Sequence, residues 1–221
     1  MEQVISLGAW CQTTWQLQRM GLRRAASPFD DTGSPMRALA AIIEAGGHGI
    51  ADDVLAIDGG HTATCRTYGL ILHHAFPRDA ADKVILNART LRRARQRMAF
   101  RWRILDAALA TGRPTLFVRH GAMARAPYIL AGERNEGPVA VDPLNLFMQA
   151  ARRRWPDTPM RTLWLLDPLV ATPVGVLDPA ITHVAATTTL GVAGEAWHGC
   201  SSTWDWALGL AAADFEPLAA A

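Results

Sequence analysis

The chain has 221 residues, half of them apolar, and a formal net charge of +2 at neutral pH. This composition can build one sizeable hydrophobic core, so we expect a single domain over residues 1–221. The nearly balanced charge argues against a general nucleic-acid binder, and no apolar run approaches the roughly 20 residues that cross a bilayer. Because no secretory signal is visible, we expect a cytoplasmic protein that binds neither nucleic acid nor membranes.

The N-terminal part of the chain predicts a strand, a tight turn and two helices. Residues 4–7 form a short apolar run, and residues 12–20 follow with helical spacing. Ser34 and Pro35 then predict the start of a second helix, with Ser34 as the capping residue. A strand followed closely by a helix is typical of an α/β fold.

The middle of the chain changes character twice. Residues 54–57 and 68–72 are β-type runs separated by turn residues, which predicts a small hairpin or a pair of short strands. Residues 79–109 form the longest helical stretch, with apolar residues at steps of three and four.

Strands alternate with helices in the second half of the chain. The expected strands cover residues 114–118, 162–166 and 183–190, and the expected helices cover residues 142–155 and begin again at Ser202. This order predicts an α/β fold with a largely parallel sheet flanked by helices, a Rossmann-like layering, into which the small hairpin is inserted.

Cys11 is the sharpest chemical feature because it lies between the first strand and the first helix. Parallel sheets bind ligands at the carboxyl ends of their strands, and the N–H groups of a helix start favour a thiolate and could hold an oxyanion. A small cysteine packed at a strand end is the competing interpretation. Cys11, Cys65 and Cys200 are odd in number and widely spaced, which predicts free thiols rather than disulfides or a zinc site.

Several short motifs follow one another along the chain: Ile5-Ser6-Leu7-Gly8-x-x-Cys11, Gly21-Leu22-Arg23, Pro28-Phe29-Asp30, His74-Ala75-Phe76, Leu116-Phe117-Val118-Arg119-x-Gly121, and Trp197-x-Gly199 with Trp204. In content and order they resemble a bacterial family of unknown function described as papain-like cysteine peptidases. The resemblance implies a thiol nucleophile at Cys11 and a base at His74. Ala75 and Ser201 stand where the family has acidic residues, so the third catalytic member stays open.

A thiol nucleophile needs a base, and histidine is suited because its unperturbed pKa of about 6.5 allows proton transfer in both directions. We expect Asp30 to orient the imidazole of His74, as the family pattern contains this acid. A turn cap or an ion pair with Arg23 is the alternative role of Asp30. Asp167 is another candidate orienting acid, and His198 is the second candidate base because some hydrolases place their histidine near the C-terminus.

The expected substrate contacts are Trp10, Gln12, Arg119 and Trp197. Backbone N–H groups from Trp10 to Gln12 would hold an oxyanion, and Arg119 would clamp a phosphate or carboxylate at a strand end. Seven arginines within residues 89–103 indicate a solvated helix face or, alternatively, a cradle for the phosphates of coenzyme A, a carrier-protein arm or a nucleotide. No glycine-rich phosphate loop or metal-ligand spacing occurs, so we expect neither metal nor cofactor.

These residues together predict an acyl-transfer enzyme acting as a peptidase or hydrolase on a small-molecule, peptide or acyl-carrier substrate. An acyltransferase or thioesterase acting on a coenzyme A- or carrier-linked substrate, in secondary metabolism or polysaccharide assembly, would share the first half of the reaction. A non-catalytic descendant that binds a ligand is the third interpretation, since Ala75 replaces an acid.

Overall fold

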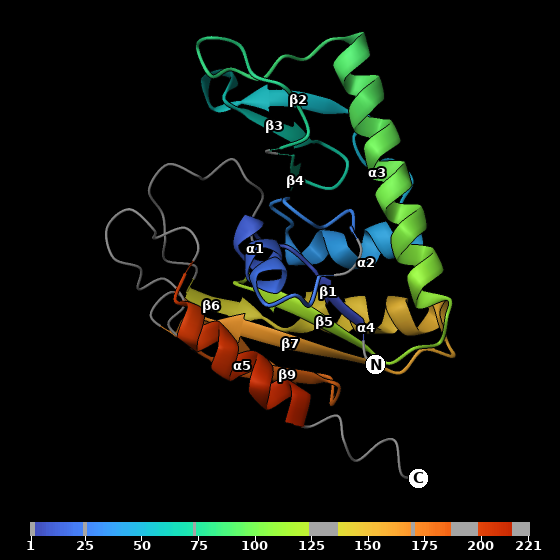
Figure 1. Cartoon of the computed structure of the whole chain (residues 1–221), viewed down its shortest axis with the longest axis vertical. Helices are drawn as coiled ribbons and strands as arrows, with labels where there is room; N and C mark the ends of the chain where they lie inside the picture. Colours follow the sequence, from blue (N-terminus) through green and yellow to red (C-terminus); the bar gives the residue numbers. More distant parts are fainter. Residues whose placement is uncertain are drawn as a thin grey trace.

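The computed structural model describes residues 3–23, 26–72, 74–123, 137–168, 171–186 and 199–213. Within these ranges the strands form a four-stranded parallel sheet, a three-stranded antiparallel sheet and a two-stranded parallel pair. The four-stranded and three-stranded sheets lie at opposite ends of the molecule, and a long helix, α3, runs between them (Figure 1). The predicted α/β class with a largely parallel sheet is therefore confirmed.

The parallel sheet contains β1 (Gln3–Ser6), β5 (Thr115–His120), β7 (Met160–Leu166) and β9 (Ile181–Ala185), in that spatial order. Successive side chains of a strand point to opposite faces, and both faces of this sheet are covered. On one face lie Leu116, Val118, Leu163 and Leu165, and on the other lie Phe117 and Trp164. The continuous apolar runs in the sequence follow from this two-sided burial.

Two pairs of helices cover the two faces of the parallel sheet. Helices α1 (Cys11–Arg19) and α5 (Ser201–Ala213) contribute Leu17 and Trp204 to one apolar cluster. Helices α2 (Met36–Glu44) and α4 (Asp142–Arg154) pack against each other on the opposite face. There the rings of Phe117 and Phe147 meet edge to face, with centroids 5.1 Å apart.

The hairpin insertion is present and has a third strand. It consists of β2 (Val54–Ile57), a 3-10 turn η1 (Asp58–Gly60), β3 (Thr62–Cys65) and the short β4 (Leu70–Ile71), all antiparallel. The partner of β2 was expected at residues 68–72, but it is the Thr-Ala-Thr-Cys run just after the turn. This run is fully buried, and its threonines conceal the apolar pattern that normally marks such a strand.

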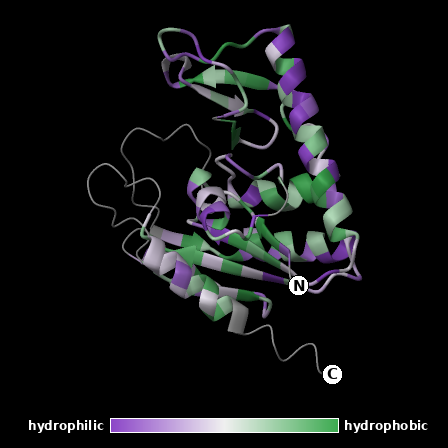
Figure 2. Cartoon of the chain, in the orientation of Figure 1, coloured by the Kyte–Doolittle hydropathy of each residue, from purple (hydrophilic) through white to green (hydrophobic). Residues whose placement is uncertain are grey.

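Helix α3 (Ala88–Leu109) begins later than the expected residue 79. The side chain of Asn87 accepts hydrogen bonds from the N–H groups of Arg89 and Thr90, and the Thr90 hydroxyl accepts one from the Asn87 N–H. This capping box fixes the helix start. The half of α3 nearer the three-stranded sheet is mostly hydrophilic (Figure 2), whereas its buried stripe continues through Met98 and Trp102.

Two strands were not expected from the sequence, β6 (Gly137–Ala140) and β8 (Ala171–Val174), and they pair in parallel. Each contains a proline, and proline argues against a strand because it cannot donate to a ladder. Pro138 and Pro173 are tolerated here because each strand has one partner in this pair. Among all the described residues, no helix is both long and apolar enough to cross a membrane.

Candidate functional site

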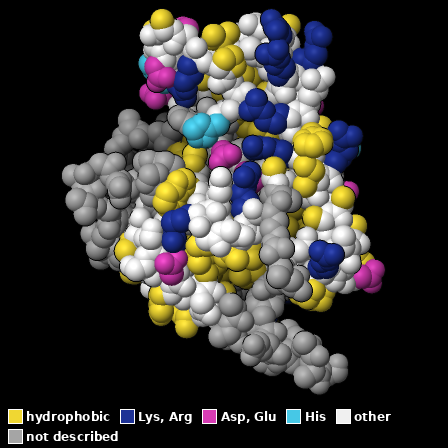
Figure 3. Space-filling view, viewed as in Figure 1, with side chains coloured by type: hydrophobic (Ala, Val, Ile, Leu, Met, Phe, Trp, Pro, Cys, Tyr) yellow, Lys and Arg dark blue, Asp and Glu magenta, His cyan; other side chains and the backbone are white. Residues whose placement is uncertain are grey.

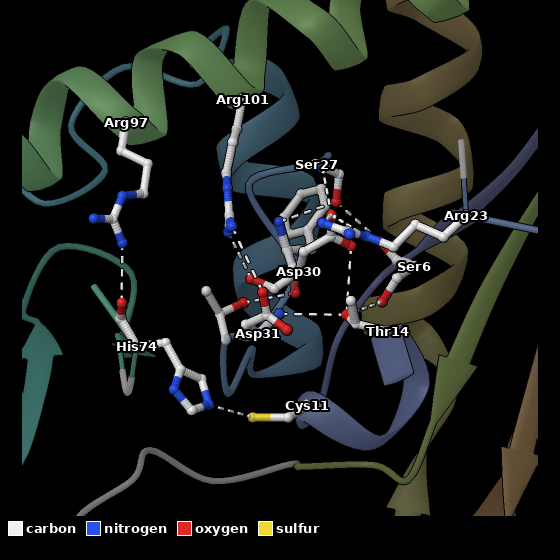
Figure 4. A network of polar contacts seen from close by, with 12 residues as sticks. Ser6, Cys11, Thr14, Arg23, Ser27, Asp30, Asp31, His74, Arg97 and Arg101 are labelled. Carbon is white, nitrogen blue, oxygen red and sulfur yellow. Dashed lines mark hydrogen bonds and ion pairs between the residues drawn. The ribbon is translucent and has the colours of Figure 1, made fainter. Parts of the chain in front are cut away.

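Cys11 and His74 meet at the surface although 63 positions separate them in the sequence. The Cys11 Sγ lies 3.3 Å from the His74 Nε2, which is hydrogen-bonding distance for sulfur (Figure 4). Cys11 is the first residue of α1 and is half-buried, whereas His74 is exposed in a turn that follows β4. The insertion therefore delivers the imidazole to the thiol that follows the first strand of the parallel sheet.

The turn before Cys11 has two residues with positive φ values, and a buried hydroxyl group holds its backbone in place. Gly8 and Ala9 have φ values of +71° and +79°, a region that favours glycine. A Cβ on Gly8 would lie 2.5 Å from the Ser34 Oγ, so a side chain has no room there. The Ser34 Oγ accepts the Ala9 N–H at 3.1 Å and thereby fixes the path into α1.

Arg119 stabilises the same turn from inside the protein. Its fully buried guanidinium donates to the Leu7 carbonyl at 3.0 Å, to the Ser34 Oγ at 2.8 Å and to the Ala122 carbonyl at 2.9 Å. The expectation that Arg119 clamps a substrate anion is therefore wrong, because its donors bind the backbone around the site. Ser34 also differs from its expected role: it donates to the Leu7 carbonyl at 2.7 Å and does not cap α2.

Asp30 does not orient His74, which corrects the expectation from the family pattern. Its carboxylate is 1% exposed and accepts from the Ser27 N–H at 2.7 Å, from Arg23 at 3.0 Å and from Thr14 at 3.4 Å. The alternative ion pair with Arg23 is thus the observed one. Burial raises the pKa of Asp30, although the Ser27 amide and Arg23 act in the opposite direction.

The acid near the thiol is Asp31, which sequence reasoning missed. Asp31 has a φ of +58°, is half-buried and pairs with Arg101 at 3.6 Å. Its negative charge acts on Cys11, and it lies with His74 along one cleft. The adjacent acids Asp30 and Asp31 are the signal that could have found it, but only the backbone turn decides which carboxylate points inward and which faces the cleft.

The electrostatics of the thiol are opposite to those expected at a helix start. Burial raises the pKa of Cys11 above its ordinary value of 9.0, and the charge of Asp31 raises it further. The Cys11 N–H lowers the pKa by less than these two effects raise it. The expectation that the helix start favours a thiolate is therefore not met, because the pKa of Cys11 is raised rather than lowered.

A cleft of about 210 Å³, including its open mouth, lies beside His74 and runs under α3. From α3, Arg97 donates to the His74 carbonyl at 3.0 Å and Arg101 donates to the Asp30 carbonyl at 3.0 Å. The residues that line the cleft are Asp30, Asp31, Thr32, Leu72, His74, Ala75, Arg97, Met98 and Arg101. The cleft thus adjoins the Cys11–His74 pair and has both charged and apolar walls.

Residues 2–65 match a family described as "Putative papain-like cysteine peptidase (DUF1796)". The chain is similar to that family over this segment. The match confirms the resemblance for the part that contains Cys11 and Asp30, and it ends before His74. Searches of curated proteins and of solved structures return no match. The family resemblance of the later motifs therefore stays a prediction.

The remaining predicted residues have different fates. Trp10 is 38% exposed next to Cys11, whereas the side chain of Gln12 is buried, so only its backbone N–H could serve a substrate. His198 and Trp197 lie outside the described residues. Burial and the positive charge of Arg119 lower the pKa of His120 to about 4. The negative charge of Asp167 acts in the opposite direction and raises this pKa.

The three cysteines are free thiols, as the sequence predicted. In the described part of the chain, no group of three or more histidine, cysteine or acidic side chains is arranged to hold a metal ion. The functional groups that the described residues bring to the site are a thiol, an imidazole, a carboxylate and two guanidinium groups.

Proposed function

We propose that this protein is a cysteine-dependent hydrolase that forms an acyl-enzyme on Cys11, with His74 as the acid–base. The observation that carries the proposal is the 3.3 Å contact between the Cys11 Sγ and the His74 Nε2. A general base must lie within hydrogen-bond reach of the proton that it removes, and this pair meets that requirement. The similarity of residues 2–65 to a family of papain-like cysteine peptidases supports the same chemistry.

In the proposed reaction, the sulfur forms a bond to the carbonyl carbon of the substrate while the thiol proton moves to the His74 Nε2. The carbonyl electron pair moves to oxygen, and backbone N–H groups at the start of α1 are the nearest donors for it. The intermediate then expels its leaving group, which takes the proton from His74. Water attacks the resulting thioester, gives a proton to His74, and releases the acid as the proton returns to the sulfur.

The raised pKa of Cys11 decides the order of events in this scheme. The thiol keeps its proton in the resting site, and the proton is transferred as the sulfur attacks. The charge of Asp31 disfavours a thiolate at Cys11 and adds to the effect of burial. A base-assisted nucleophile therefore fits this site better than a preformed thiolate.

The first half-reaction is common to hydrolysis and to transfer, so a peptidase, a thioesterase and an acyltransferase differ here only in the leaving group and the acceptor. A small-molecule, peptide or acyl-carrier substrate is compatible with the open mouth of the cleft. A panel of activated esters, thioesters and peptides is therefore the appropriate first assay.

The test compares the wild-type protein with Cys11→Ala and His74→Ala on this panel, with Cys200→Ala as the matched thiol control. We expect each site variant to lose about 10³-fold or more in kcat/KM, while Cys200→Ala stays within about twofold of wild type. Intact-mass spectrometry after rapid acid quenching should find the acyl group on Cys11.

Two results would contradict the proposal. Cys11→Ala could retain wild-type turnover, which would remove the nucleophile. Alternatively, the folded wild-type protein could process no member of the panel and carry no acyl group, which would favour the non-catalytic, ligand-binding interpretation.

A further inference from the structure

Arg97 lines the cleft beside the Cys11–His74 pair, and the described residues give it no acidic partner. Arg97 and Arg101 are four residues apart on α3, so they project from the same side of the helix. Arg101 pairs with Asp31, and the inward-facing Asp30 pairs with Arg23. No described carboxylate lies within ion-pair distance of Arg97, so its charge has no ion-pair partner, although the two aspartates and two arginines of the lining balance formally.

Arg97 is held in place even though it lacks an acidic partner in the described part of the chain. Its Nη1 donates to the backbone carbonyl of His74 at 3.0 Å, which ties the guanidinium to the residue that carries the base (Figure 4). One donor of five is used in this bond, and the planar guanidinium can offer a pair of the others to an oxyanion. An arginine fixed in this way has already lost part of its rotamer entropy before a ligand arrives.

Other arginines of α3 differ from Arg97 because they have an acidic partner or lie outside the cleft. Arg95 pairs with Asp52 at 3.3 Å and donates to two backbone carbonyls, so its charge is compensated within the insertion. Arg93 is exposed on the same helix and does not line the cleft. Basic side chains gather over α3 beside a histidine and an acidic side chain on this face (Figure 3). Arg97 is therefore the cation of this helix best placed for a ligand.

The walls and the size of the cleft indicate the kind of anion. Leu72, Ala75 and Met98 contribute apolar surface, which strengthens an ion pair by excluding water. The enclosed part of the cleft is only about 10 Å³, so it admits a single small polar group, and the rest of a ligand would lie in the open mouth. A carboxylate matches the guanidinium fork in two parallel hydrogen bonds.

We propose that this cleft binds a carboxylate on the acyl part of the substrate, so that the enzyme prefers short acidic acyl groups such as those of dicarboxylic acids. This inference rests on the proposed function, because it assigns a substrate class to the same site. Asp31 weakens the attraction, and the pairing of Asp31 with Arg101 limits that effect.

The test uses the thiols themselves and needs no turnover. The full-length protein is labelled at low ionic strength with 3-maleimidopropionate or with its neutral amide, and peptide mass spectrometry follows Cys11 and Cys200 in the same sample. The rate ratio of acid to amide cancels the thiolate population of each cysteine, because both reagents meet the same thiol. The ratio therefore reports only how the surroundings treat the carboxylate.

We expect the acid-to-amide ratio at Cys11 to exceed the ratio at Cys200 by about fivefold, the effect of one partly exposed ion pair. Arg97→Gln should reduce the Cys11 ratio to that of Cys200, whereas Arg93→Gln should leave it unchanged. Equal ratios at the two cysteines, or a Cys11 ratio that Arg97→Gln does not change, would overturn the inference. So would stronger protection of Cys11 by inorganic phosphate than by glutarate at equal concentration.

The two proposals fail in different ways. Loss of the charge preference with intact turnover on neutral esters would remove the carboxylate site and keep the nucleophile. A clear charge preference at Cys11 in a protein without turnover would keep the binding site and remove the enzyme.

Discussion

Cys11 and Cys200 both lie at the start of a helix, yet their surroundings shift the two thiol pKa values in opposite directions. Cys200 directly precedes α5, is half-buried, and lies with its Sγ 3.1 Å from the Ser202 Oγ. Hydrogen bonds from Ser202 and Thr203 lower its pKa to about 7. Cys11 is half-buried next to Asp31, and both features raise its pKa.

A helix start does not by itself produce a thiolate. The N–H groups of a first turn stabilise negative charge, but their contribution is modest and is lost when the sulfur is desolvated beside a carboxylate. The cysteine that has an imidazole at 3.3 Å is thus the one whose thiol holds its proton more tightly. This combination is expected of a nucleophile that depends on a base.

The two helix starts also differ in the contacts that stabilise them. A substitution that removes these contacts before α1 has the largest expected effect. The turn before α1 rests on the buried guanidinium of Arg119, which donates to Leu7 and Ser34. We expect Arg119→Met to lower the free energy of unfolding by about 3 kcal/mol, because several buried acceptors lose a charged donor. Urea denaturation followed by far-UV circular dichroism measures the change.

Ser202→Ala is the matched change at the other helix start. Because the hydroxyl of Ser202 lies at the surface, we expect this variant to lose less than about 1 kcal/mol. If Arg119→Met were as stable as Ser202→Ala, the turn before Cys11 would not depend on the buried network.

Much of the fold could be predicted because parallel strands and amphipathic helices leave periodic apolar patterns. The runs that became β5 and β7 are buried on both faces, and the stripe through Met98 and Trp102 gave the buried face of α3. These apolar patterns did not predict the elements in which polar residues form a buried strand or cap a helix. Thr62–Cys65 is a buried strand rich in threonine, and the start of α3 depends on a capping box at Asn87 rather than on hydropathy.

The site was predictable in part, for a related reason. Cys11 follows a strand and starts a helix, which is a local feature, and His74 was available from the family motif. The partners of Asp30, Asp31 and Arg119 depend on contacts between distant segments, which one sequence does not reveal. Arginine and aspartate are typical of functional sites, but Arg119 and Asp30 are buried here. Arg119 donates to a backbone carbonyl, and Asp30 accepts from a backbone N–H and from Arg23.

The second prediction tests the opposite pKa shifts directly. At pH 7 about half of Cys200 is thiolate, whereas the raised pKa of Cys11 keeps its thiol mostly protonated. The lower intrinsic nucleophilicity of the more acidic thiolate offsets part of this advantage, so we expect iodoacetamide to modify Cys200 at least about fivefold faster than Cys11. Peptide mass spectrometry measures both rates in one sample.

The pH profiles sharpen this test. The rate at Cys200 should reach half its maximum near pH 7, whereas the rate at Cys11 should still rise above pH 9, because a raised pKa delays formation of the thiolate. Faster modification of Cys11 at pH 7 would mean that the imidazole outweighs burial and Asp31 and forms a thiolate in the resting protein.

The smallest expected effect is that of Asp31→Asn, which tests how much Asp31 contributes to the different modification rates of Cys11 and Cys200. Asp31→Asn removes a negative charge that raises the pKa of Cys11, and it leaves the surroundings of Cys200 unchanged. A partly exposed charge contributes about 0.5 kcal/mol, which corresponds to about a twofold faster modification of Cys11 at pH 7. Cys200 in the same sample is the control, and a slower Cys11 would show that Asp31 acts mainly through the imidazole.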